Sequence, residues 1–78
     1  MAKITKHVEV FFDPVRSITF QVELKRCREG GYVVFVPYLP GCLSEGDNMA
    51  DTLNNIKEAI ELWLEPISEA ELLALHLG

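Results

Sequence analysis

The sequence predicts an α+β fold in which a small antiparallel sheet of three to four strands packs on one main helix. Two patterns support this prediction. Strand-like alternation and turn signals fill the first part of the chain, and apolar residues at helical spacing fill the second. The chain has 78 residues, which is too short for two domains. We therefore expect a single domain over residues 1–78.

The first predicted hairpin covers residues 17–36. From Ser17 to Lys25 apolar and polar residues alternate, which is typical of a strand with one buried face. The paired glycines that follow, Gly30 and Gly31, suit a tight turn. Tyr32 to Val36 is aromatic and β-branched and favours a central strand. These two runs are expected to pair with each other.

Two more strands are predicted on either side of this hairpin. Pro37 ends the central strand, and Pro40-Gly41 has the residue order of a type II turn, so Cys42 to Glu45 can form a short strand after it. Upstream, His7 to Phe12 is a weaker candidate that ends at the Asp13-Pro14 turn signal. It lies in residues 1–14, which we take as an N-terminal extension to a core at 17–65.

The main helix is predicted from Met49 to Glu65. Its apolar residues recur in steps of four and three and form one stripe: Met49, Leu53, Ile56, Ile60 and Trp63. Asn48 can cap the N-terminus, with Asp51 at the acidic position of a capping box, and Pro66 ends the helix.

The leucine-rich segment 66–78 has two possible conformations. Ser68 and Glu71 repeat the capping-box spacing and favour a short helix, whereas alternation in 73–77 favours a strand. In both cases the segment has too many apolar groups for a free tail, so it is predicted to cover the core or a second subunit. The candidate interface of a dimer or higher homo-oligomer is Leu72, Leu73, Leu75 and Leu77.

Charge and apolar content limit the classes of partner. The formal net charge of -5 argues against direct DNA or RNA binding and suits a basic partner, although it also serves solubility alone. Neither a signal peptide nor a membrane span is evident, so we expect a cytoplasmic protein and no membrane partner. Cys27 and Cys42 lack metal or redox spacing and are expected to be small, buried apolar side chains; whether they lie close together stays open.

Catalytic chemistry finds little support. His7 and His76 lie near the termini without the context of a triad. Several carboxylates could in principle hold two Mg²⁺ ions, but their positions on polar strand faces, in a turn and at a helix start explain them better. These are Glu9, Asp13, Glu23, Glu45, Asp47 and Asp51. We expect no catalytic residue, metal site or cofactor.

Two segments together resemble the HicB antitoxin family. They are GYVVFVPYLPGCLSEGD at residues 31–47 and NNIKEAIELWLE at residues 54–65, roughly half of the chain. The resemblance implies a partial RNase H-like fold without the nuclease carboxylates. It also implies a partner, HicA, a small basic toxin that cleaves RNA. HicB proteins usually add a C-terminal DNA-binding domain, for which the residues after Glu65 are too few, so only the N-terminal domain is expected here.

The hypothesis from the sequence is therefore an antitoxin-like domain that occludes a HicA-like toxin. The alternatives are a stand-alone oligomeric domain without a toxin and a degenerate metal-dependent nuclease. Structural roles are expected for the motif residues Pro37, Leu39, Pro40, Gly41, Cys42, Gly46, Asp47 and Asn48. Tyr38, Leu39 and Glu45 are expected to be exposed and to contact the partner.

Overall fold

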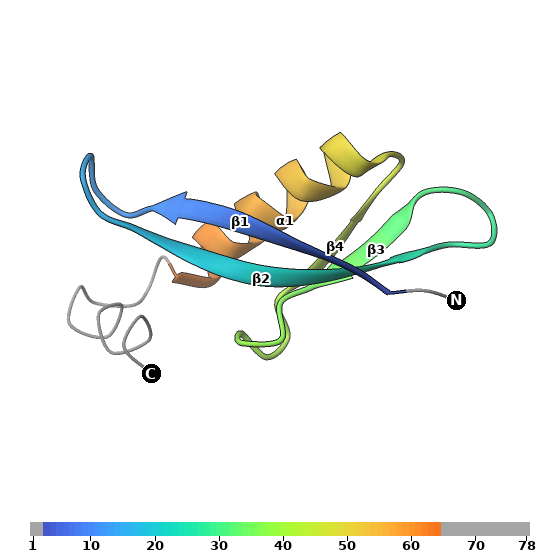
Figure 1. Ribbon diagram of the computed structural model, residues 1–78, viewed down its shortest axis with the longest axis horizontal. Coiled ribbons are helices and arrows are strands. Elements are labelled where there is room, and N and C mark those ends of the chain that lie inside the picture. Colours follow the sequence, from blue (N-terminus) through green and yellow to red (C-terminus); the bar gives the residue numbers. More distant parts are fainter. Residues whose placement is uncertain (1–2, 65–78) are drawn as a thin grey trace.

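The computed structural model describes residues 3–64, which form one sheet and one helix (Figure 1). The strands are β1 (Ile4–Phe11), β2 (Ser17–Arg26), β3 (Tyr32–Phe35) and β4 (Leu43–Gly46), and the helix is α1 (Met49–Leu64). All strand pairs are antiparallel, and the strand order is β1-β2-β3-β4. The predicted α+β class is confirmed. The leucine-rich segment, with its candidate interface and its helix-or-strand alternative, lies outside the described residues.

The N-terminal strand is longer than predicted and belongs to the core. β1 begins at Ile4 rather than His7 and pairs with β2 along its whole length, from Ile4 opposite Leu24 to Phe11 opposite Ser17. Its inward side chains Val8 and Val10 are 7% and 3% exposed. The core therefore starts before residue 17.

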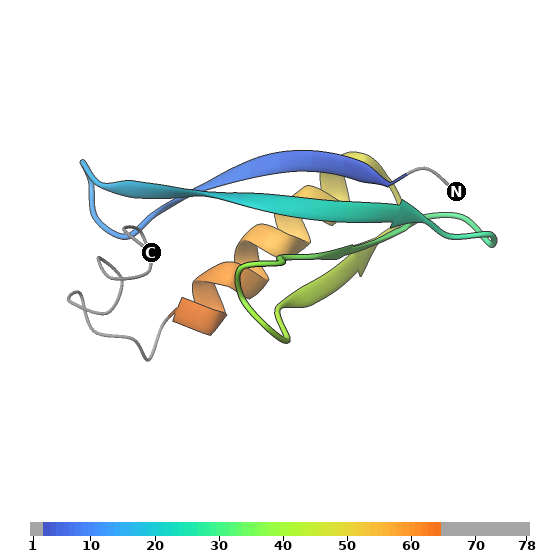
Figure 2. The same ribbon diagram turned by 60° about the horizontal axis from the view of Figure 1, so that its bottom comes forward.

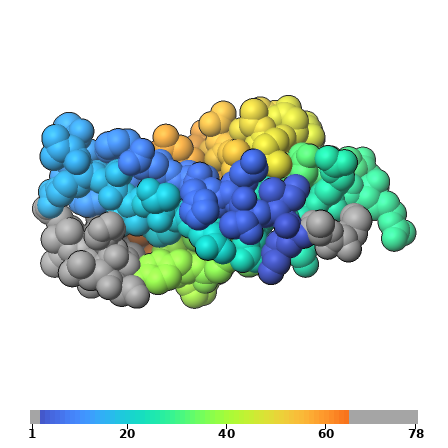
Figure 3. Space-filling model, in the orientation of Figure 1, coloured from blue at the N-terminus to red at the C-terminus, as the bar shows by residue number. Residues whose placement is uncertain are grey.

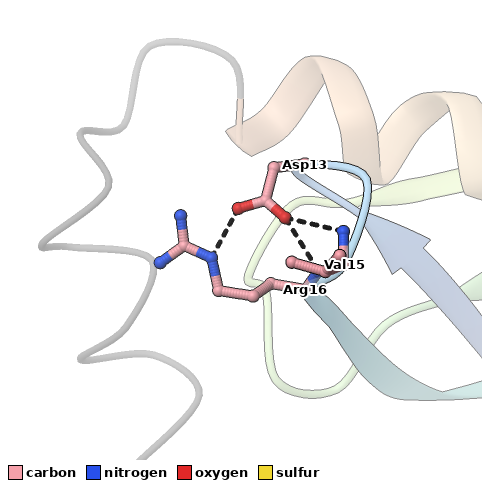
Figure 4. A network of polar contacts seen from close by, with 3 residues as sticks. All are labelled: Asp13, Val15 and Arg16. Carbon is pink, nitrogen blue, oxygen red and sulfur yellow. Dashed lines mark hydrogen bonds and ion pairs between the residues drawn. The ribbon is translucent and has the colours of Figure 1, made fainter.

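The turn between β1 and β2 is held by one carboxylate (Figure 4). Asp13 Oδ1 accepts backbone hydrogen bonds from Val15, at 2.9 Å, and from Arg16, at 2.8 Å, while Oδ2 pairs with the Arg16 side chain. The hydrogen bond from Val15 is the main reason that the pKa of Asp13 lies below its ordinary value. Desolvation opposes it, and the hydrogen bonds and charge of Arg16 support it.

The helix packs on one face of the sheet, which both ribbon views show (Figures 1 and 2). It buries Thr52, Ile56, Ile60 and Leu64 against the inward side chains of the strands. The predicted stripe is confirmed at Ile56 and Ile60, while Met49, Leu53 and Trp63 flank it and are partly buried. The best-buried sheet residues facing α1 are Val22, Leu24 and Val34.

The other face of the sheet is left uncovered by the described residues. Along β2 the outward residues Thr19, Gln21 and Lys25 are exposed, as the predicted alternation requires. Figure 3 shows how β1 and β2 spread across one side of the molecule, with the turn at residues 27–31 projecting at one end. None of the described helices is long and apolar enough to cross a membrane.

Candidate protein-binding surface

The proline-rich loop between β3 and β4 is two turns in succession. Leu39 donates its N–H to the Val36 carbonyl at 3.1 Å, and Cys42 donates to the Leu39 carbonyl at 3.0 Å. A bond from Val36 N–H to the Cys42 carbonyl, also 3.0 Å, closes the loop. Gly41 has a φ of 81°, the left-handed value that a type II turn needs at its third position. The loop is thus a rigid continuation of the hairpin.

Leu39 anchors this loop in the core. Its side chain is fully buried, with 0% exposure, so the expectation that it is exposed for partner contact is wrong. The tight turns on either side point Leu39 inward, where it belongs to the core cluster with Ile60. From the helix, Trp63 Nε1 donates to the Pro40 carbonyl at 3.2 Å and fixes the outer turn. Tyr38 remains accessible, at 45% exposure.

The start of α1 is fixed by a cap and by a close approach to β4. Asn48 Oδ1 accepts the Asp51 N–H at 2.8 Å, and its amide donates to the Asp51 carboxylate at 3.2 Å. In a standard capping box the acidic side chain accepts a hydrogen bond from the backbone N–H of the cap residue; here it accepts one from the side-chain amide of Asn48 instead. Gly46 lies against Thr52, where an added Cβ would be 2.6 Å from the Thr52 nitrogen. Only glycine allows the helix to lie this close to β4.

The outer face of β3 and β4 carries an apolar patch that we name the hairpin patch: Val33, Phe35 and Leu43. Their exposed fractions are 41%, 38% and 67%, and Phe35 lies directly opposite Leu43 in the pairing of the two strands. An open hollow of about 770 Å³ follows the hairpin and its loop. Glu45, predicted as a contact residue, is exposed on the same face, opposite Val33. Exposed apolar groups gathered in this way are typical of a protein-binding surface.

The sequence did not single out this patch. A continuous apolar run such as residues 32–36 usually marks a strand buried on both faces. The signal that could have found it is that the sequence predicts one main helix, and one helix can cover only one face of a sheet.

The other candidate groups are scattered. Among residues 3–64, no three His, Cys, Asp or Glu side chains are placed to hold a metal ion. Glu9 accepts a hydrogen bond from Ser17, and Glu23 forms an ion pair with Lys3 at 3.2 Å. Cys27 and Cys42 are both free thiols. Cys42 is buried as expected, and burial raises the pKa of its thiol, whereas Cys27 is only partly buried because it lies beside the turn after β2.

Comparison with known proteins assigns the family. The model of the HicB-like antitoxin of bacterial toxin–antitoxin systems matches residues 20–74, which is more than half of the chain. The chain belongs to the HicB-like antitoxin family. The resemblance stated from the motif in 31–47 and 54–65 is confirmed, and the match begins within β2, so β1 lies outside it.

Several curated relatives share this region. A UPF0150 protein of Helicobacter pylori strain J99 is 52% identical over 44 residues, covering 56% of this chain and 61% of the relative. A UPF0150 protein of Synechocystis is 41% identical over 54 residues, covering 69% and 68%. Another from Archaeoglobus fulgidus is 41% identical over 46 residues, covering 59% and 67%. The chain thus spans about three fifths of the Helicobacter relative. No solved structure matches it, so the partial RNase H-like fold stays a prediction.

Proposed function

We propose that this chain is an antitoxin domain that neutralises a small, basic, RNA-cleaving toxin of the HicA kind by covering its catalytic face. The observation that carries the proposal is the match over residues 20–74 to a family described as antitoxins of toxin–antitoxin systems. An antitoxin of this type acts by binding, so the proposal assigns no reaction to this chain.

Two properties of the chain support a basic protein as the partner. The net charge is -5, which attracts a basic protein over a distance and speeds its association. The hairpin patch supplies apolar area of the kind that dominates binding once the partner has docked. Self-association through the leucines of segment 66–78 stays a second prediction. We place the binding role in the cytoplasm, because the RNA that such a toxin cleaves is found there.

The test has two steps. Tagged protein is first recovered from its native host at low and at high salt, and a small basic protein that high salt releases is identified by mass. That protein is then assayed for RNA cleavage while the purified chain is titrated in. We expect cleavage to stop at a fixed molar ratio.

An unrelated acidic protein of similar net charge is the control, because it separates occlusion from simple electrostatic capture. Recovery of the chain alone, or cleavage that persists at excess chain, would overturn the antitoxin proposal. Recovery of the chain only as a complex with itself would instead support the stand-alone oligomer.

A further inference from the structure

The outer edge of β4 is an unpaired strand edge among the described residues. Val36 N–H donates to the Cys42 carbonyl, so the backbone groups of Cys42 face β3. Backbone groups alternate in direction along an antiparallel strand, and those of Leu43 and Glu45 therefore point away from β3. Since β4 is the last strand of the sheet, they point to its open edge.

One of these edge groups already has a partner, which locates the helix relative to the edge. Asn55 of α1 donates its side-chain amide to the Glu45 carbonyl at 2.7 Å. No hydrogen bond within residues 3–64 outside the strand ladder reaches the N–H of Leu43, the carbonyl of Leu43 or the N–H of Glu45. Three adjacent backbone groups are thus available to an added strand.

The side of α1 that Asn55 brings to this edge is acidic. Asp51, Asn55, Glu58 and Leu62 follow one another in steps of four, three and four, which places them along one side of the helix. All four are exposed, and Leu62 is 67% exposed. We name these four residues the helix flank.

Helix flank and strand edge run side by side. Gly46 contacts Thr52, Glu45 binds Asn55, and Pro40 binds Trp63, so β4 and α1 are antiparallel neighbours over their common length. The combined surface carries two exposed leucines, Leu43 and Leu62, at 67% each. Three carboxylates accompany them, on Glu45, Asp51 and Glu58.

We infer that this surface binds an extended basic segment of the partner protein, which adds to β4 as a further antiparallel strand. Its backbone would bond Leu43 and the Glu45 N–H, and its apolar side chains would cover the hairpin patch. Its Lys or Arg side chains would point to the other face of the sheet, where the helix flank carries the Asp51 and Glu58 carboxylates. Strand addition of this kind takes affinity from main-chain hydrogen bonds and specificity from the alternating side chains. The inference rests on the proposed function only for the role of the partner.

Charge favours a basic segment over a second copy of the chain, and the β4 edge over the β1 edge. A second copy of the chain paired through the same edge would place the Glu45, Asp51 and Glu58 carboxylates of both copies close together, which like-charge repulsion disfavours. The opposite edge of the sheet, β1, contains Lys6 and Glu9, and the Lys3 beside it is paired with Glu23, so this edge offers a basic strand no net negative charge. Within residues 3–64, the β4 edge is therefore the one that combines open backbone groups with net negative charge.

The test uses a synthetic nine-residue peptide that alternates Lys and Val, followed by NMR on the labelled protein. We expect saturable shifts centred on the amides of Leu43 and Glu45, together with slower hydrogen exchange at both. A peptide that alternates Glu and Val is the control and is expected not to bind.

Substitutions then separate the backbone contribution from charge. Leu43→Pro removes an N–H that faces away from β3, so the fold tolerates it; it is expected to weaken peptide binding about five- to tenfold. Glu45→Lys and Glu58→Lys together are expected to weaken it about tenfold or more at low salt. Glu29→Lys, the same charge change in the β2–β3 turn, is the matched control and is expected to have a much smaller effect.

Each outcome decides the inference independently of the antitoxin proposal. Shifts that map to β1 or to no continuous surface, or Leu43→Pro binding like the native chain, would overturn it. Concentration-dependent shifts at Leu43 and Glu45 without peptide would overturn it in favour of a second copy. If the peptide binds at β4 but no toxin is found, or the toxin is inactive, the proposed function is refuted and the inference about the β4 surface stands.

Discussion

Replacing Gly46 by alanine tests the closest approach between the sheet and the helix. The added Cβ would lie 2.6 Å from the Thr52 nitrogen, 2.6 Å from its Oγ1 and 2.8 Å from its Cα. These distances are shorter than real Cβ contacts, and two of the three atoms belong to the backbone. The first turn of α1 would have to move away from β4, together with the partly buried hydrogen bond of 2.6 Å from Thr52 Oγ1 to the Asn48 carbonyl.

Overpacking of this kind costs typically ~1–3 kcal/mol, and alanine recovers part of it because it is the better strand residue by roughly 0.5–1 kcal/mol. We expect the net free energy of unfolding to fall by about 1–2 kcal/mol, with the midpoint of thermal unfolding lower by roughly 4–16 °C in a domain of this size. Urea unfolding followed by circular dichroism measures the change.

The double variant Gly46→Ala with Thr52→Ala identifies the clashing atoms. Removing Oγ1 leaves the backbone nitrogen and Cα of residue 52 in place, so the alanine at 46 is expected to cost nearly as much in this background. If Thr52→Ala fully restores the stability lost in Gly46→Ala, the clash is with the Thr52 side chain and not with the backbone. A native-like stability of the single variant would refute the close approach itself.

Three further measurements test separate features. Asn48→Ala removes the helix cap and is expected to lower the free energy of unfolding by ~1 kcal/mol, whereas Asn54→Ala, an exposed asparagine inside α1, leaves it equal or slightly higher; equal losses in urea would contradict the cap. The pKa of Asp13 is lower in the folded chain than in the unfolded one, so its contribution to stability is complete above the ordinary aspartate pKa and is lost as the pH falls through the lowered value. Asp13→Asn should therefore flatten the acid side of the stability profile in urea melts from pH 6 down to pH 2, and an unchanged profile would exclude the turn as its source. Cys42 is 4% exposed with a raised thiol pKa, so a thiol reagent is expected to label Cys27 quickly and Cys42 slowly, and the loss of the slow phase in Cys27→Ser would contradict burial of Cys42.

Periodicity made most of the fold predictable. The stripe through Ile56 and Ile60 and the alternation in residues 17–25 each bury one face, and both patterns can be read over more than two turns or strand repeats. The predicted strand at His7 to Phe12 began too late, because Thr5, Lys6 and His7 are polar and show no alternation with apolar residues. Pairing with β2, a tertiary effect, extends it to Ile4.

The candidate site was less predictable because it depends on contacts across the chain. A loop residue between two prolines is normally exposed, and only the packing of the double turn places Leu39 in the core. The contact of Gly46 with Thr52 and the bond of Asn55 to Glu45 join separate elements and leave no local pattern. Val33 and Phe35 are likewise exposed because α1 covers only the opposite face of the sheet, which no local pattern in the sequence shows.

The order of the elements has a consequence for the chain while it is being made. Each strand pairs with the one just before it, so the four described strands can assemble as soon as residues 4–46 have left the ribosome. Its inward face, which includes Val22, Leu24 and Val34, has no cover until α1 follows. An apolar sheet face with open edges is prone to aggregation in this interval. Docking of α1 therefore completes the core and, in the same step, removes the apolar sheet face that could aggregate.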